Sequence, residues 1–376
     1  MSRPAFERVL VLSVSAGAGH LRAADAVAAG LKQEGVALAV THLDILKHSS
    51  ALMRNLYART YIKLASVAPD LLGWVYDRSD RPWKFLRRRT AFDRANLGGM
   101  IAAVEAARPD LVVCTHFTPA EVCSWLKARG RLRAPLAVVV TDFDAHGMWL
   151  VPRVDRYYVA LDETKEYLAR VHVPAARIRV TGIPIDPVFA LNKDRALMRR
   201  RHGLHPRHPA IIVSAGGFGV GPVEALLKSL RGLRHPAQVI ALCGRNDALR
   251  RKLAPLGRAA GAVTFHIMGF TDRMDELMSA SDLVLGKPGG LTTSEALAKG
   301  LGMVIVNPIP GQEERNADHL LEAGAAIRCN NPPVLAWKLD RLLGDPARLA
   351  SLRRNARRLG RPHAARTIAR DLATLR

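Results

Sequence analysis

A glycine turn near the start of the chain could bring a histidine to the end of a helix. Gly19 and His20 lie between a predicted strand over residues 9–15 and a predicted helix over 21–34. The free amides and the positive dipole end of such a helix attract oxygen-rich or anionic groups. They also disfavour a protonated imidazole, so His20 could be a neutral base or simply cap the turn. Arg22 stands where a dinucleotide-binding fingerprint needs its third glycine, which weakens that interpretation.

A second loop carries carboxylates. Asp142, Asp144 and His146 follow a predicted buried strand over residues 136–141. Carboxylates and imidazoles at a strand end are the groups that general acid–base catalysis uses, although an aspartate there can also form an ordinary turn. Asp142 and His20 are therefore the candidate catalytic bases, with Asp144 and His146 in reserve. The spacing does not rank them.

Two glycine loops in the second half of the chain could bind phosphate. Gly216 and Gly217 belong to a loop over residues 214–221, and Gly289 and Gly290 precede another predicted helix. Unobstructed backbone amides in such loops suit a diphosphate. The first loop is not followed by the Lys-Ser or Lys-Thr of a Walker A motif, so we do not expect ATP hydrolysis of that type.

Polar residues follow these loops. Thr292 and Glu295 have the spacing of a capping box, which gives both of them an alternative, purely structural role. Gln312, Glu313 and Asn316 follow a proline turn that could project amide and carboxylate groups toward sugar hydroxyls. In isolation the same residues could begin an ordinary polar helix.

Strands alternate with helices along the chain, which predicts an α/β fold of two doubly wound Rossmann-like domains. The predicted strands cover residues 9–15, 37–43, 111–114, 136–141, 156–160, 210–214, 239–243, 263–267, 283–285 and 303–306. A charged stretch over 192–209 is the predicted linker. We expect a first domain over 1–190, a second over 191–350, and a basic helical tail over 351–376 that could pack back on the first. Such domains bind ligands where the carboxyl ends of their strands face each other across a cleft.

The composition limits the partners and the compartment. A net charge of +23 at pH 7 attracts nucleic acid, anionic lipid or phosphorylated ligands, although a high arginine content can also be a compositional bias. The four cysteines form no CxxC pair, so we expect neither a disulfide framework nor a zinc site, and a reducing compartment fits. No run of about 18 apolar residues occurs, so we expect any membrane contact to be peripheral.

Taken together, these segments resemble glycosyltransferase family 28, and most closely its diacylglycerol-sugar branch. The resemblance rests on SAGAGH, PDLVVCTHF, TDFDAHGMW, VTGIPIDPVF, GGFGVG, LVLGKPGGLTTSEAL and NPIPGQEERNA, which occur in the family's order. It implies the GT-B fold, with the acceptor in the first domain and the nucleotide in the second. It also implies inverting transfer of glucose or galactose from a UDP-sugar to 1,2-diacylglycerol, without a metal or a further cofactor.

The resemblance also implies roles for individual residues. The diphosphate contacts are Gly216, Gly217, Gly289, Gly290 and Thr292, with Phe270 at the uracil, Glu295 at the ribose hydroxyls, and Gln312, Glu313 and Asn316 at the sugar. The first domain contributes Asp142 and His20 as candidate bases, and Gly19, His146 and Trp149 toward the acceptor. Val151 departs from the pattern, because glycolipid relatives often have a second histidine there.

One segment of the first domain, residues 49–100, mixes apolar and basic side chains. The apolar ones are Leu71, Leu72, Trp74, Val75, Tyr76, Trp83, Phe85 and Leu86, and the basic ones are Arg78, Arg81, Lys84, Arg87, Arg88 and Arg89. This mixture favours contact with an anionic membrane, here at the cytoplasmic face of the cell membrane. The alternative is a helix pair that covers the first sheet and keeps its arginines in water.

Three other functions explain fewer of these features. An N-acetylglucosaminyltransferase acting on an undecaprenyl-linked peptidoglycan precursor shares the loops, but TDFDAHGMW and PGQE favour diacylglycerol. A nucleic-acid-binding protein would use the basic surface, but the chain carries no recognised motif for it, so no nucleic acid partner is expected. A nicotinamide-dependent oxidoreductase is disfavoured by Arg22.

Overall fold

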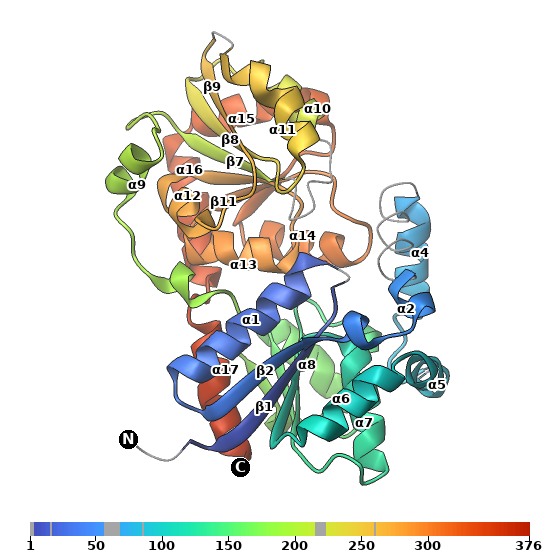
Figure 1. The fold of residues 1–376 in the computed structure, drawn as a ribbon. Helices are drawn as coiled ribbons and strands as arrows, with labels where there is room; N and C mark the ends of the chain where they lie inside the picture. The colour runs from blue at the N-terminus through green and yellow to red at the C-terminus, as the bar shows by residue number, and fades with distance from the viewer. Residues whose placement is uncertain (1–3, 16, 56–67, 85, 215–222, 259–260) are drawn as a thin grey trace.

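Two parallel sheets, each of six strands, dominate the computed structural model (Figure 1). It describes residues 4–15, 17–55, 68–84, 86–214, 223–258 and 261–376. Helices lie on both faces of each sheet, and both chain ends lie at the first domain (Figure 1). The predicted doubly wound α/β architecture is therefore confirmed.

The first sheet has the strand order β2-β1-β3-β4-β5-β6. Its strands are β1 (Phe6–Ser13), β2 (Ala37–Asp44), β3 (Leu111–Cys114), β4 (Leu136–Val139), β5 (Arg156–Val159) and β6 (Ile178–Val180). The central strands are continuous apolar runs because helices bury both of their faces. Its helices are α1 (Ala18–Gln33), α2 (Ala51–Asn55), α4 (Pro69–Ser79), α5 (Leu86–Asn96), α6 (Gly98–Ala107), α7 (Phe117–Ala128) and α8 (Asp162–Arg170).

The second sheet has the strand order β12-β11-β10-β7-β8-β9. Its strands are β7 (Ala210–Ser214), β8 (Ala237–Leu242), β9 (Val263–Met268), β10 (Leu283–Gly286), β11 (Gly302–Ile305) and β12 (Ala326–Arg328). Its helices are α9 (Arg195–Arg201), α10 (Val223–Leu230), α11 (Asp247–Leu253), α12 (Met274–Ala280), α13 (Gly290–Ala298), α14 (Gln312–Glu322), α15 (Leu335–Leu343) and α16 (Pro346–Leu359). Short 3₁₀ turns include η3 (Gly147–Trp149) and η5 (Pro187–Ala190).

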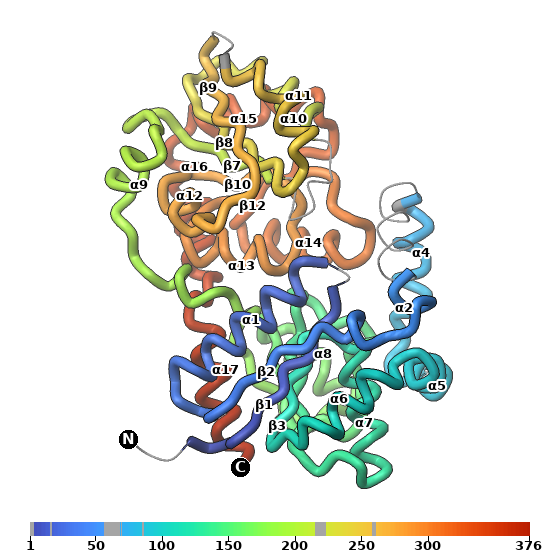
Figure 2. The backbone as a smooth tube through the Cα atoms, in the orientation of Figure 1, coloured from blue at the N-terminus to red at the C-terminus, as the bar shows by residue number. Residues whose placement is uncertain are grey.

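The last helix, α17 (Ala364–Leu372), returns to the first domain and lies beside α1 (Figure 2). Gly30 of α1 makes this close approach possible, since a Cβ there would meet the Ala365 carbonyl oxygen at 2.6 Å. Arg366 and Arg370 each bind Glu34 at 2.6 Å. The expected boundary at residue 350 falls inside α16, which packs on α13 and α15 of the second domain. The part of the tail that returns to the first domain is α17 and the short turn after it.

No helix in the described part of the chain is both long enough and apolar enough to cross a membrane.

Candidate active site

The order of each sheet shows which loops form the site. The chain reverses direction across the first sheet between β1 and β3, and across the second between β7 and β10. Ligands of doubly wound domains bind at these switch points, outside the carboxyl ends of the strands. The loops there carry His20, the glycine turn before α13, and residues 215–222, which include Gly216 and Gly217 and lie outside the described residues. The diphosphate roles of those two glycines remain predictions.

His20 lies in the first turn of α1 and points at the ends of β3 and β4. Its Nδ1 is 3.1 Å from the Thr115 carbonyl oxygen and 2.9 Å from Oγ1 of Thr141. Burial lowers the pKa of His20 to about 4, against the raising effect of the Thr115 hydrogen bond. The ring is therefore neutral at pH 7. Since a carbonyl only accepts, Nδ1 donates to Thr115 and Nε2 carries the lone pair.

Asp142 is buried where the chain leaves β4. The Nε2 of Gln312, on the second domain, donates a hydrogen bond to its Oδ1. Burial raises the pKa of Asp142 to about 7, and the charges of Glu313 and Asp144 act in the same direction. The Gln312 amide and the Trp149 indole lower the pKa by donating to the carboxylate. A pKa close to neutral suits a general base better than the value of His20 does.

His146 has a structural role in this arrangement. Its Nδ1 accepts from the Met148 amide at 3.1 Å and caps η3, while its Nε2 donates to the Tyr76 carbonyl at 2.9 Å. Both ring nitrogens are engaged, which leaves none for acid–base work here. Its predicted acceptor role could therefore be only indirect, through the position of α4.

Trp149 and Gly19, which are predicted to contact the acceptor, both belong to the first domain. The Trp149 indole is buried and packs edge-to-face on Phe117 at 5.7 Å between ring centroids, with His116 at 6.3 Å. The indole also donates to the Asp142 carboxylate, so Trp149 helps to hold this side chain in place. Gly19 faces the second domain, since a Cβ there would lie 3.6 Å from Cδ2 of Leu291.

The glycine turn before α13 brings the two domains into contact. A Cβ on Gly290 would collide with the Thr141 carbonyl oxygen, so glycine is required there by the neighbouring domain as well as by any phosphate. The N-cap is Gly289, without a side-chain cap, and the capping-box alternative for Thr292 and Glu295 is therefore wrong. Glu295 forms an ion pair with Arg22 of α1 instead.

The start of α14 presents the predicted sugar-binding residues to the first domain. Gln312 contacts Asp142, as described. Glu313 accepts from the Ile309 amide at 2.7 Å, and its Oε1 lies 3.6 Å from where Gly289 would carry a Cβ. Asn316 is buried, accepts from the Phe143 amide at 3.0 Å and donates to the Pro288 carbonyl at 3.1 Å. Asn316 therefore joins the domains here, and its sugar contact remains a prediction.

Phe270 follows β9 and is 63% exposed, with the Arg245 guanidinium 5.1 Å from its ring centroid. An exposed ring of this kind can stack on a base, and the uracil role remains a prediction.

Comparisons with known proteins assign the chain to a family. Residues 20–185 match the profile described as monogalactosyldiacylglycerol (MGDG) synthase, and residues 195–359 match glycosyl transferases group 1. A processive diacylglycerol beta-glucosyltransferase of Staphylococcus haemolyticus is 31% identical over 329 residues, covering 87% of this chain and 82% of that protein. The chain belongs to glycosyltransferase family 28. A relative of the same description from Bacillus subtilis is 29% identical, covering 97% of this chain and 94% of that protein.

Solved structures confirm the GT-B fold of this glycosyltransferase. MurG of Acinetobacter baumannii superposes with a TM-score of 0.64 at 18% identity, covering 98% of this chain and 99% of that one. The S. aureus MnaA structure with UDP gives 0.64 at 13% identity, covering 97% and 96%. At these identities the likeness shows the fold alone.

Arg315 contacts residues of the candidate site and was missed by sequence reasoning. Its guanidinium binds Asp80 at 2.7 Å and Asp144 at 3.2 Å, and lies 5.2 Å from the centroid of the Tyr76 ring. It thus joins α14 to the end of α4 and to the loop that follows β4. A signal was present in the sequence, since Arg315 directly follows the polar run that begins at Gln312.

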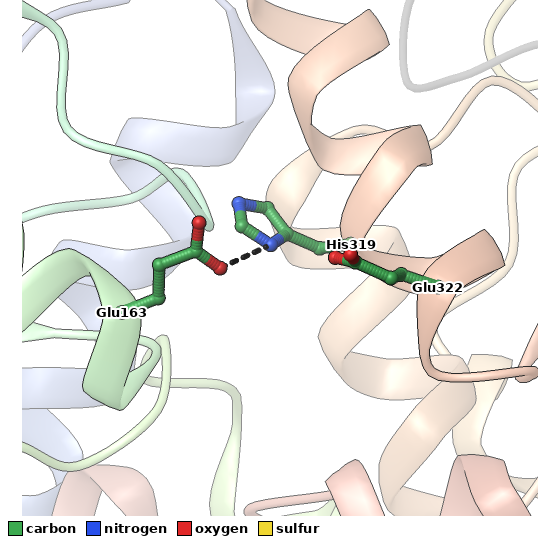
Figure 3. A group of neighbouring side chains, drawn as sticks. All are labelled: Glu163, His319 and Glu322. Atoms are coloured by element: carbon green, nitrogen blue, oxygen red, sulfur yellow. Dashed lines mark ion pairs between the residues drawn. The ribbon is translucent and has the colours of Figure 1, made fainter.

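A possible cation-binding group lies elsewhere on the domain interface (Figure 3). Among the described residues, Glu163, His319 and Glu322 place their ligand atoms within 4.8 Å of one another. Glu163 already pairs with Nδ1 of His319 at 3.3 Å, and both glutamates are exposed. The group borders an interdomain pocket of about 360 Å³ that includes none of the predicted site residues. We assign it no part in catalysis, and the expected independence from metal remains a prediction.

Proposed function

We propose that this enzyme transfers a hexose from a UDP-sugar to a hydroxyl of 1,2-diacylglycerol. The contact between Asp142 and Gln312 supports this most directly, because it joins the candidate base of the acceptor domain to a candidate sugar-binding residue of the donor domain. The match of residues 20–185 to the MGDG synthase profile supports a lipid acceptor. The names of the relatives favour glucose as the hexose and a β-linked product.

The proposed reaction is a single displacement that inverts the anomeric carbon. The acceptor oxygen forms a bond to that carbon as the bond to the β-phosphate oxygen breaks, and UDP leaves with the electron pair. The Asp142 carboxylate takes the acceptor proton, while neutral His20 helps to orient the hydroxyl. The amides at the start of α13 stabilise the negative charge that develops on the diphosphate, so the step needs no metal or cofactor.

The direct test incubates the purified protein with dispersed diacylglycerol and separately labelled UDP-glucose, UDP-galactose and UDP-N-acetylglucosamine, then separates the lipids. We expect labelled monohexosyl diacylglycerol, with glucose transferred fastest. An undecaprenyl-linked acceptor serves as the competing substrate. Transfer of N-acetylglucosamine to that acceptor, without any product on diacylglycerol, would show the proposal to be wrong.

We also propose that the enzyme reaches its lipid by docking at the inner face of the cell membrane through α4, α5 and the turn between them. Exposed apolar side chains occur here beside exposed Lys84, Arg87 and Arg88. The apolar ones are Leu71, Trp74, Val75, Trp83 and Phe92. The four cysteines are free and buried, as fits a reducing compartment.

Contacts within the protein distinguish the side chains that we propose for docking from those with a structural role. Arg89 pairs with buried Glu121, and Tyr76 packs under Arg315, so neither faces the membrane in this proposal. Trp83 is 38% exposed and donates from its indole to the Val171 carbonyl at 2.8 Å, whereas Trp74 is 59% exposed. Trp74 is therefore the cleaner probe. Phe85 lies outside the described residues.

Replacing Lys84, Arg87 and Arg88 together with serine should weaken binding to anionic vesicles about 100-fold at low salt, because each cation near such a surface contributes about 1 kcal/mol. Trp74→Ala should weaken binding with little dependence on salt, because its contribution is apolar burial. Co-sedimentation with vesicles at two salt concentrations measures both effects.

Thermal melts and a soluble short-chain acceptor are the controls for this test. We expect both variants to keep their melting temperature and their activity on that acceptor. Arg89→Ser should instead lower the melting temperature, because it leaves Glu121 buried and unpaired. Vesicle binding of the triple variant at the wild-type level would remove this surface from the proposal.

A further inference from the structure

An ion pair between the domains joins a residue of the acceptor domain to the predicted ribose site. Arg22 projects from α1, and its guanidinium binds Oε1 of Glu295 on α13. The Glu295 side chain is 2% exposed, while that of Arg22 is 43% exposed. The carboxylate of the pair is thus buried, while part of the Arg22 side chain is exposed to solvent.

Only one of the two oxygens of the Glu295 carboxylate has a partner among the described residues. Oε2 of Glu295 is buried and has no hydrogen-bond partner among the residues that the structure describes. A buried carboxylate oxygen without a donor is costly, which points to a ligand hydroxyl as its partner. The oxygen is part of the same side chain that Arg22 holds, so a group bound there also lies close to the guanidinium.

Arg22 can bind more than one group at a time. A guanidinium has five N–H donors in a planar fork, and the Glu295 contact is made through one of its nitrogens. Burial lowers the pKa of Arg22 and nearby Asp186 opposes this, but a guanidinium remains charged at neutral pH. The remaining donors suit a phosphate oxygen, and Glu295 lies on the helix whose glycine turn is the predicted diphosphate site.

We propose that Arg22 is a donor-binding residue contributed by the acceptor domain. It orients Glu295 so that Oε2 accepts a ribose hydroxyl, and its remaining N–H groups donate to a diphosphate oxygen of the same nucleotide. This rests on the proposed function, which supplies the UDP-sugar. The proposal gives a role to Arg22, which stands where a dinucleotide-binding fingerprint has its third glycine. It also makes nucleotide binding depend on contact between the two domains.

The test compares UDP with uridine, which lacks the phosphates, by calorimetry. Arg22→Ala should weaken UDP binding about 10- to 100-fold, as expected for a lost charge-assisted hydrogen bond, and uridine binding by less than about threefold. Arg22→Lys should fall between, because an ammonium lacks the planar fork. Glu163→Gln is the matched control, since it removes another ion pair between the domains, and it should leave UDP and uridine affinity unchanged.

Arg22→Ala leaves Glu295 buried without its cation, so a second comparison uses Glu295→Gln and the double variant Arg22→Ala, Glu295→Gln. The ratio of UDP affinity to uridine affinity should be lower in the double variant than in Glu295→Gln alone. An unchanged ratio of UDP to uridine affinity in both backgrounds would show that Arg22 only joins the domains. Failure of the wild-type protein to bind UDP would instead overturn the proposed function, so the two outcomes are distinct.

Discussion

Asp142→Asn is expected to slow sugar transfer by about 10²- to 10⁴-fold, the usual contribution of a positioned general base. Asparagine keeps an oxygen that can accept from the Gln312 amide, so the contact between the domains survives while the proton acceptor is lost. UDP affinity should stay within about threefold, or about 0.6 kcal/mol. Turnover of UDP-glucose on dispersed diacylglycerol and calorimetry with UDP measure the two quantities.

The pKa of Asp142 gives this prediction a second readout. A base must be deprotonated, so kcat/KM of the wild-type enzyme should rise with pH through about 7, the pKa that burial gives this carboxyl.

The same pKa shift should make the folded protein less stable as pH rises. Between about pH 4 and 7 the unfolded chain ionises Asp142 while the folded chain holds its proton, so the wild-type protein loses stability as pH rises. Asp142→Asn removes this loss, and its melting temperature relative to wild type should increase across that window.

Asp144→Asn is the matched control. It makes the same chemical change two residues away, but Asp144 binds Arg315 and not Gln312. Its activity should fall far less than that of Asp142→Asn. If Asp142→Asn loses no more activity than Asp144→Asn, and the wild-type profile is flat near neutrality, the base role moves to His20, whose pKa of about 4 predicts such a flat profile.

Two strands inside the sheets, which helices bury on both faces, gave clear apolar runs. Leu111–Cys114 and Ala210–Ser214 were predicted at their observed bounds for this reason. The edge strands Ile178–Val180 and Ala326–Arg328 were missed, because three residues with partly exposed side chains give no apolar run. The crossing of α17 depends on a glycine in α1 and on Arg–Glu pairs more than 300 residues apart, which local periodicity does not contain.

The site was predictable as a set of loops and not as a set of contacts. Parallel sheets put the carboxyl ends of their strands at one edge, so the loops that carry His20, Asp142 and Gln312 had to meet. Which side chains touch depends on how one domain sits on the other. Only the structure therefore shows the contacts Asp142–Gln312 and Arg22–Glu295. It also shows that Arg89 forms an ion pair with Glu121 instead of facing solvent.

The largest loss on the donor side is expected from Glu313→Ala. Burial raises the pKa of Glu313, and the Ile309 amide and the charge of Lys287 lower it. A carboxylate held by a backbone amide beside the Gly289 turn is a rigid acceptor for sugar hydroxyls. We expect kcat/KM for UDP-glucose to fall about 100-fold or more, because hydrogen bonds to a charged group contribute about 1.5–3 kcal/mol each. UDP, which carries no hexose, should bind nearly as well as to wild type.

Two further variants separate the sugar contact from local structure. Glu313→Gln keeps an oxygen for the Ile309 amide but replaces one acceptor with a donor, so it should preserve the fold and still lose most of the activity. Glu314→Ala, one residue further on, removes a carboxylate that accepts hydrogen bonds from Arg328 and from the Gly311 amide. It should lower the free energy of unfolding by about 1 kcal/mol and reduce activity little. UDP affinity that falls in parallel with kcat/KM in Glu313→Gln would place this carboxylate at the nucleotide. Loss confined to the sugar substrate places it at the hexose, beside the amide that reaches Asp142.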